Sequence, residues 1–153
     1  MKALELKLPP PAVFLITGLA MWGLARALPW AAFDLPARLP LVIVLAGLGA
    51  LLGLACILCF WKARTTVDPR KPHEASAFVC SGPYRLSRNP MYACLLIWLL
   101  AWGIFLSNAV AFLPIPVFVA YLNRFQILPE EQALAEKFGP AFEAYKRNVR
   151  RWL

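Results

Sequence analysis

Long uncharged, apolar runs alternate with shorter polar segments along this chain. The uncharged runs cover residues 8–25, 39–61 and 89–123. A bilayer core of about 30 Å needs about 20 apolar residues in a helix that rises about 1.5 Å per residue. The first two runs therefore predict one transmembrane helix each, and the third is long enough for two.

The third run has a natural break at Ser107 and Asn108. Both residues favour turns and helix caps over helix interiors, so they predict a tight turn between two spans. Pro90 suits the first position of the third span, with Asn89 before it as the N-cap. The predicted spans are approximately residues 9–27, 39–61, 90–107 and 109–127.

Two polar segments complete the pattern. Residues 62–89 form the longest one and predict a loop. Residues 129–151 carry apolar positions at three- or four-residue spacing on a basic background, which predicts an amphipathic tail helix. Pro129 followed by Glu130 and Glu131 is typical of a helix start, because proline suits the first position and acids suit the first turn.

Composition and charge agree with a membrane protein. Hydrophobic residues make up 61% of the 153 residues, whereas soluble domains contain roughly 45–50%. Fourteen of the sixteen Lys and Arg residues precede the first span, lie in the 62–89 loop, or follow residue 123. The positive-inside rule then predicts that both termini and this loop are cytoplasmic. We interpret the chain as one all-α, multi-pass domain, residues 1–153, of the inner (plasma) membrane.

Several other function classes are disfavoured. The net charge of +8 suits anionic lipid headgroups, and no soluble basic domain remains that could bind nucleic acid. Cys56 and Cys59 lie one helical turn apart inside an apolar span, where packing is the favoured role, and His73 is the single histidine. We therefore expect no metal site. A cleaved secretory signal is disfavoured because three further spans follow the first.

Polar side chains gather where the predicted third span begins and the fourth ends. The hairpin between these spans brings residues 81–92 and 123–131 together on the cytoplasmic side. Polar groups beside membrane helices are costly, so their convergence indicates a site. Each could also serve only as a topology charge, an interfacial aromatic or a first-turn acid. The converging residues are Tyr84, Arg88, Asn89, Tyr92, Asn123, Arg124, Gln126, Glu130 and Glu131.

Two sequence blocks in this region match a known pattern. They read Gly82-Pro83-Tyr84-x-x-x-Arg88-Asn89-Pro90-x-Tyr92, and Pro129-Glu130-Glu131 followed by Phe138-Gly139-x-x-Phe142-x-x-Tyr145. From about residue 65 to the C-terminus, the chain resembles a short, bacterial-type member of the isoprenylcysteine carboxyl methyltransferase family, which is related to the phospholipid N-methyltransferases. The resemblance implies a membrane methyltransferase that uses S-adenosylmethionine without a Rossmann domain. It also implies a cytoplasmic cofactor pocket covered by the tail helix.

The resemblance further implies roles for individual residues. Arg88, Glu131 and Tyr92 form the implied catalytic group, in which Arg88 organises the pocket. Glu131 or Tyr92 would take a proton from an amine or thiol acceptor. Arg124 and Gln126 are the implied substrate-binding residues. The implied cofactor-binding residues are Ser76, Ala77, Phe78, Val79, Tyr84, Asn89, Pro90, Met91, Tyr92 and Glu130.

Two departures from the eukaryotic prenylcysteine enzymes leave the acceptor open. Those enzymes have a histidine in place of Asn89 and an arginine for the substrate carboxylate near Gln126. The hypothesis is therefore methyl transfer to a lipophilic or lipid-like acceptor, with membrane lipids as partners. The alternatives are an NADPH-dependent membrane reductase related to sterol reductases, and a small non-enzymatic membrane protein. Four spans leave no room for the extra helices of the reductases.

Overall fold

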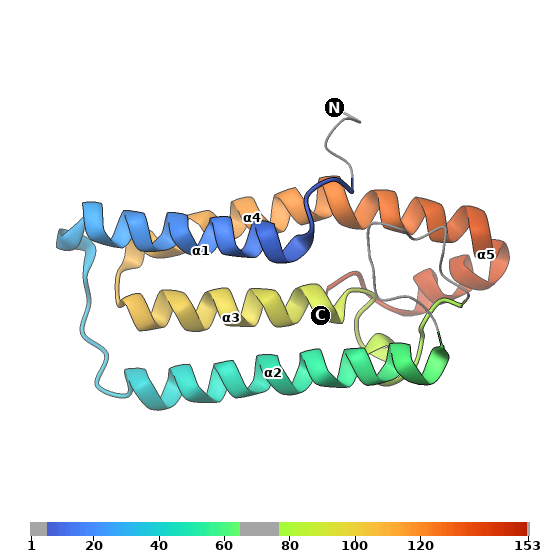
Figure 1. Cartoon of the computed structure of the whole chain (residues 1–153), viewed down its shortest axis with the longest axis horizontal. Coiled ribbons are helices and arrows are strands. Elements are labelled where there is room, and N and C mark those ends of the chain that lie inside the picture. Colours follow the sequence, from blue (N-terminus) through green and yellow to red (C-terminus); the bar gives the residue numbers. More distant parts are fainter. Residues whose placement is uncertain (1–5, 65–76, 153) are drawn as a thin grey trace.

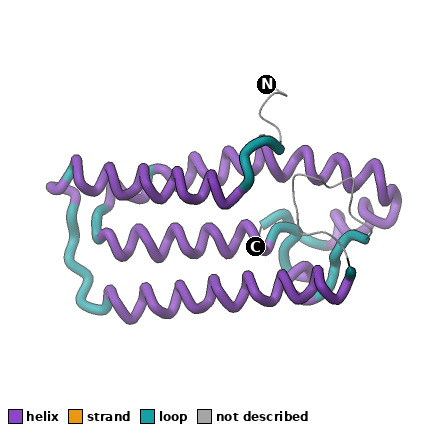
Figure 2. The backbone as a smooth tube through the Cα atoms, in the orientation of Figure 1, coloured by secondary structure: helices purple, strands orange, loops and turns teal. Residues whose placement is uncertain are grey.

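The computed structural model describes residues 6–64 and 77–152. Within these residues the chain is all-helical and contains no strand (Figures 1 and 2). The predicted all-α class is therefore confirmed. The remaining residues, which include Ser76 and much of the predicted 62–89 loop, lie outside the described residues.

Three helices lie close to predicted spans. They are α1 (Pro10–Ala27), α2 (Arg38–Ala63) and α3 (Pro90–Leu106). α3 begins at Pro90, as expected, but Asn89 makes no side-chain cap. Its amide Nδ2 instead donates to the Arg151 carbonyl at 2.9 Å. Asn89 therefore occupies the N-cap position, as predicted, but its side chain bonds to a distant carbonyl and does not cap the helix.

The predicted break at Ser107 and Asn108 is confirmed. Ser107 ends α3 with a left-handed backbone (φ 50°), and a short 3-10 turn, η5 (Ala109–Phe112), follows. The Asn108 side chain caps this turn by accepting from the Val110 amide. Its Nδ2 also donates to the Leu28 carbonyl at 2.8 Å. One asparagine thus ties the turn after α3 to the end of α1.

The fourth span continues into the tail helix without a loop. α4 (Pro114–Leu122), a π-helical turn η6 (Asn123–Ile127) and α5 (Leu128–Asn148) follow one another as a continuous helical trace (Figure 2). α5 carries Pro129, Glu130 and Glu131 in its first turn, as predicted, but this helix continues from the fourth span without a loop. A bend comes later, at Gly139, whose φ of 53° is non-helical.

Pro129 explains an unusual hydrogen bond beside the π-helical turn. Proline has no N–H, so it cannot donate to the carbonyl four residues earlier in a helix. That carbonyl belongs to Phe125, and it accepts from the Leu6 amide at 3.0 Å instead. Within the turn, the Leu128 amide bonds to the Asn123 carbonyl five residues back. The N-terminal segment is thus fastened where the helix widens.

The helices pack around α3. α3 lies between α1 and α2 and contacts both, and α1 also packs on α4 (Figure 1). Phe118, Leu99 and Leu122 are fully buried where α1, α3 and α4 meet. Between helices in a bilayer, association depends on close packing of this kind, since lipid tails are as apolar as leucine.

The outward surface is apolar. Leu19 on α1 and Leu51 on α2 are each 67% exposed, and Val117 on α4 is 69% exposed. Three helical stretches, Pro10–Ala27, Arg38–Ala63 and Ala109–Phe138, are long and apolar enough to cross a membrane, and Pro90–Leu106 is a shorter apolar helix. Contact of such an apolar surface with lipid is favourable, whereas its contact with water is unfavourable. The chain is a membrane protein.

Candidate active site

Tyr92 and Glu130 meet at one end of the helices. The Tyr92 hydroxyl donates to Glu130 Oε2 at 2.9 Å. Tyr92 lies in the first turn of α3, and Glu130 lies just after the π-helical turn. The Gln126 side chain, from within that turn, also hydrogen-bonds the Tyr92 hydroxyl. The predicted meeting of residues 81–92 with residues 123–131 is therefore present in the structure.

A cavity of about 390 Å³ lies beside this pair. Its polar lining comes from Tyr84, Arg88, Asn89, Tyr92 and Glu130. The rest is mainly apolar and includes Phe60 on α2, Leu95 and Trp98 on α3, and Pro10 and Pro11 at the start of α1. We call this space the polar cavity. Its volume lies within the roughly 300–1,000 Å³ range of ligand pockets in proteins.

Tyr84 forms one wall of the polar cavity. It belongs to a short 3-10 turn, η4 (Gly82–Arg85), and is 7% exposed. Its ring packs edge-on against Phe60 at 5.6 Å, and its carbonyl accepts from the Tyr145 hydroxyl at 2.7 Å. Burial raises the pKa of both tyrosines above the usual value. Tyr84 is therefore held as a neutral side chain between α2 and α5.

Gly82 allows this turn to approach α2 closely. Its φ is +57°, a conformation that glycine adopts without a steric penalty. A Cβ at this position would lie 2.7 Å from Cys59 Sγ on α2. The turn that presents Tyr84 therefore depends on a missing side chain.

Behind the polar cavity, Glu131 is clamped by two arginines. Arg88 Nη2 lies 3.0 Å from Glu131 Oε1, and Arg151 Nη2 lies 2.7 Å from Oε2. The Glu131 and Arg88 side chains are only 9% and 11% exposed. Charge-assisted, partly bidentate contacts of this kind are strong and directional. Both carboxylate oxygens of Glu131 are thus engaged, and Glu131 does not line the polar cavity.

The end of the chain is held by the loop before α3. We call residues 149–152 the C-terminal strap. The Arg88 amide donates to the Arg150 carbonyl at 2.8 Å, and Arg88 Nη1 donates to the Val149 carbonyl at 3.0 Å. Trp152 Nε1 donates to Asn123 Oδ1 at 3.0 Å, on the π-helical turn. The strap therefore joins the two segments that bear the site.

Other predicted cofactor residues lie elsewhere. Phe78 packs against an aromatic cluster on α5, with ring centroids 5.2 Å from Phe138 and 5.8 Å from Phe142. Val79 is buried in a cluster that includes Tyr84. Phe78, Val79 and the half-buried Ala77 do not line the polar cavity, although Val79 packs with Tyr84, which does.

The remaining predicted residues divide between the cavity and its surroundings. Met91 lines the polar cavity, whereas the buried Pro90 does not. Gln126 is only 2% exposed and reaches Tyr92. Arg124 is exposed, with its guanidinium 5.5 Å from the Phe125 ring centroid, and it does not line the polar cavity.

Sequence reasoning missed several contributors to the site. The polar cavity is also lined by Trp98, Leu95, Cys94 and the prolines Pro10 and Pro11, which in the sequence look like ordinary packing residues. The π-helical turn was also missed, although Pro129, which frees a carbonyl inside a helix, was a signal for irregular geometry. π-helical turns occur frequently at functional sites.

The fold and site together define an all-helical membrane protein with a carboxylate-bearing polar cavity at one end of its helices. The phospholipid methyltransferase family matches residues 38–141, and this chain belongs to that family. The match runs from α2 into α5 and includes Tyr84, Tyr92 and Glu130. The resemblance predicted from the sequence is thereby confirmed, and the chain is a membrane protein of a methyltransferase family.

One curated relative is much shorter than this chain. An uncharacterized protein of Haemophilus influenzae (strain ATCC 51907 / DSM 11121 / KW20 / Rd) is 48% identical over 63 residues. The similarity spans 41% of this chain and 100% of that protein. No solved structure matches the chain.

Proposed function

We propose that this protein is an S-adenosylmethionine-dependent methyltransferase that acts on a lipophilic or lipid-like acceptor at the cytoplasmic face of the membrane. The observation that carries the proposal is the Tyr92–Glu130 pair in the polar cavity, inside the segment that matches the family. We also propose four spans, since the 17 residues of α3 are at the lower limit for crossing a bilayer. The positive-inside rule then supports cytoplasmic termini.

The residues of the polar cavity fit a cationic cofactor with an aromatic base. The guanidinium of Arg88 is already engaged by Glu131 and by backbone carbonyls. Glu130 is the carboxylate that faces the space. A carboxylate attracts a sulfonium or ammonium group, and the rings of Tyr84, Tyr92 and Phe60 suit contact with cations and aromatic bases. S-adenosylmethionine, when bound, supplies an electrophilic methyl group.

Positioning is the main task of these side chains. In-line methyl transfer needs the reacting atoms about 3–3.5 Å apart and aligned. Tyr92 fixes the direction of the Glu130 carboxylate through its hydrogen bond. The tail contributes from behind, because the strap and Arg88 hold the loop that carries Tyr84 and Asn89. This arrangement supports a tail that covers one side of the cofactor pocket.

The acceptor decides whether a base is required. A carboxylate acceptor is already a nucleophile, whereas an amine or thiol must lose a proton. Tyr92 lines the polar cavity and is placed to relay one toward Glu130. Both oxygens of Glu131 are held by arginines. Glu131 is therefore better suited to positioning Arg88 than to proton transfer.

Calorimetric titration of the purified protein in lipid nanodiscs tests the proposal. We expect binding of S-adenosylmethionine and S-adenosylhomocysteine and none of NADPH. If neither adenosyl compound binds, the proposal is refuted, and binding of NADPH in their place would support a reductase. Transfer of a labelled methyl group to prenylated thiols, aminolipids and small thiols would then identify the acceptor class.

A further inference from the structure

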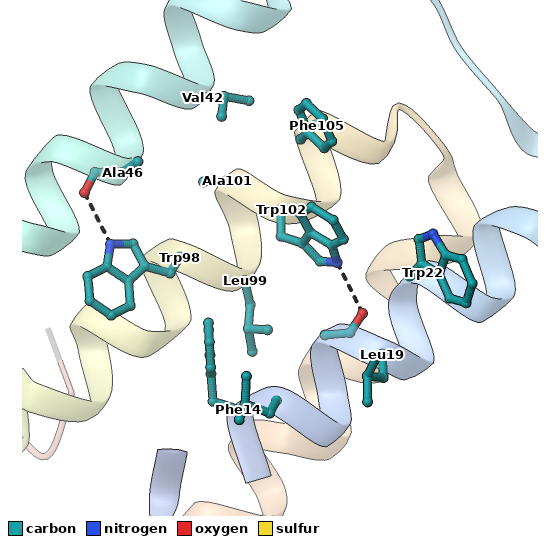
Figure 3. A pocket seen from close by; sticks show the side chains of 12 residues that line it. Phe14, Leu19, Trp22, Val42, Ala46, Trp98, Leu99, Ala101, Trp102 and Phe105 are labelled. Atoms are coloured by element: carbon teal, nitrogen blue, oxygen red, sulfur yellow. Dashed lines mark hydrogen bonds between the residues drawn. The ribbon is translucent and has the colours of Figure 1, made fainter. Parts of the chain in front are cut away.

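A second, larger hollow lies next to the polar cavity. It has a volume of about 730 Å³ and lies between α1 and α2, with α3 along its floor (Figure 3). Its walls are apolar side chains, such as Leu19 on α1, Val42 on α2 and Leu99 on α3. All three helices are apolar enough to lie in a membrane. We call this hollow the chain groove.

The chain groove is open to the surroundings of the protein. Leu15, Leu19 and Trp22 on its α1 side are 62%, 67% and 47% exposed. In a bilayer these side chains face lipid, and an apolar hollow beside them takes up hydrocarbon in preference to water. A chain in the groove is thus reached from the membrane.

Trp98 lies at the junction between the chain groove and the polar cavity and lines both. Its indole Nε1 donates to the Ala46 carbonyl on α2 at 3.1 Å (Figure 3). Its ring also packs edge-on against Phe14 on α1, with centroids 6.2 Å apart. A bulky side chain from α3 is therefore held by the helices on both sides.

Gly49 makes room for this indole. A Cβ at Gly49 would lie 2.6 Å from Trp98 Cδ1, so any side chain there must displace the ring. A Cβ at Gly47, two residues earlier on the same helix, would have nothing within 4 Å. The position of Trp98 is thus set jointly by α3 and by one glycine of α2.

We propose that the chain groove binds a hydrocarbon chain of the methyl acceptor, and that Trp98 is a specificity-determining residue that stops this chain at the polar cavity. The inference rests on the proposed function, because it assumes an acceptor whose polar head enters the cavity. Because Trp98 lines both spaces, a chain in the groove and a head in the polar cavity lie on opposite sides of the indole. Acceptors with a slender neck are favoured over those that are bulky next to the reacting group.

Photolabelling with hexadecylamine that carries a mid-chain diazirine tests this inference in phosphatidylcholine nanodiscs. In the native protein we expect label on groove residues such as Leu19 and Trp102, and excess plain hexadecylamine should compete with it. Trp98→Ala removes the stop, so the fraction of label on Leu95 and Met91 should rise by about tenfold, the scale on which a change in pocket size alters selection.

Two glycine variants make a matched pair for the same experiment. Gly49→Ala should shift the label toward Leu95 as Trp98→Ala does, because it displaces the indole. Gly47→Ala should leave the native pattern. If Trp98→Ala does not fold, Trp98→Phe, which keeps a ring and loses the bond to Ala46, should shift the label in the same direction.

An unchanged pattern in Gly49→Ala and the folded Trp98 variant would overturn the inference, as would label that plain hexadecylamine does not displace. Titration of the same samples with S-adenosylmethionine separates this failure from failure of the proposed function. Cofactor binding with an unmoved label refutes only the role of Trp98. Competed, movable label without cofactor binding refutes the methyltransferase proposal and leaves a hydrocarbon site.

Discussion

The hydroxyl of Tyr92 donates a 2.9 Å hydrogen bond to Glu130 Oε2, across 38 positions of sequence. This contact joins the first turn of α3 to the helix that continues from α4, and both residues line the polar cavity. It therefore joins the two helices at the candidate site. Its removal should weaken ligand binding more than it lowers the stability of the fold.

Glu130→Gln should weaken S-adenosylmethionine binding by about 10- to 100-fold. The change keeps the shape of the side chain and removes its charge, and a hydrogen bond or contact to a charged group is worth about 1.5–3 kcal/mol. Tyr92→Phe should cost about fivefold, since it removes one neutral donor at about 1 kcal/mol. Calorimetry in nanodiscs provides the affinities.

Glu136→Gln is the control for this measurement. Glu136 lies on the same helix, is exposed and is absent from the cavity lining. The Glu136→Gln variant should bind S-adenosylmethionine with the affinity of the native protein. Native affinity in both the Glu130 and the Tyr92 variants would remove the site assignment.

Glu131→Ala should lower the free energy of unfolding by about 3 kcal/mol, because it leaves two arginines facing each other without their shared carboxylate. Glu131 is the suitable test residue since its side chain is only 9% exposed. Chemical unfolding in detergent, followed by circular dichroism, would measure the difference from the native protein.

Glu143→Ala provides the comparison for this loss. Glu143 pairs with Lys146 on the surface of α5, where the two side chains are 48% and 36% exposed. Solvent screens such a pair, so the change should stay within about 0.5 kcal/mol. Equal effects of the two substitutions would contradict a structural role for the Arg88–Glu131–Arg151 cluster.

Stability should fall as the pH rises above about 10, where a tyrosine in the unfolded chain ionises. Burial raises the pKa of Tyr84 and Tyr145 in the folded protein. In that pH range the folded state keeps protons that the unfolded state loses, so each further rise favours unfolding. Below pH 9 the two tyrosines should contribute no slope.

The double variant Tyr84→Phe/Tyr145→Phe should show a shallower decline between pH 9.5 and 11. Unfolding free energies measured at intervals across this range would give both slopes. Parallel curves for the native and double-variant proteins would show that these tyrosines do not carry the alkaline dependence.

Reporter fusions at residues 70 and 153 should both give cytoplasmic signals. The prediction follows from the distribution of Lys and Arg, fourteen of which fall on one side in the four-span arrangement. A fusion at Asp34, in the connection between α1 and α2, should report the opposite side. An extracytoplasmic signal at residue 70 or 153 would overturn the four-span proposal.

Helix positions were largely predictable. The apolar runs placed α1, α2 and α3 to within a few residues, because hydrocarbon thickness and helix rise impose the length of each span. The break at Ser107 and Asn108 followed from local turn chemistry in the same way. The join between the fourth span and the tail was not predictable, since the π-helical turn depends on Leu6 satisfying the carbonyl that Pro129 leaves open.

The site was only partly predictable. Polar residues next to membrane helices stand out in a sequence, so Tyr84, Tyr92 and Glu130 could be selected on cost alone. Trp98 and Leu95 could not, because an apolar residue that lines a cavity has the same sequence signature as one that fills a core. Phe78 and Val79 were predicted from the resemblance and lie outside the cavity lining, where Val79 packs with Tyr84.

The sequence by itself determined the all-helical class, the apolar helices that make this a membrane protein, and the two segments that carry the polar residues. These follow from local patterns, since hydrophobic length and turn chemistry act over a few residues. Only the tertiary structure decided how those polar residues divide their work. Glu130 faces the polar cavity and its neighbour Glu131 faces two arginines, because the helix turns successive side chains by about 100° and different elements meet each face.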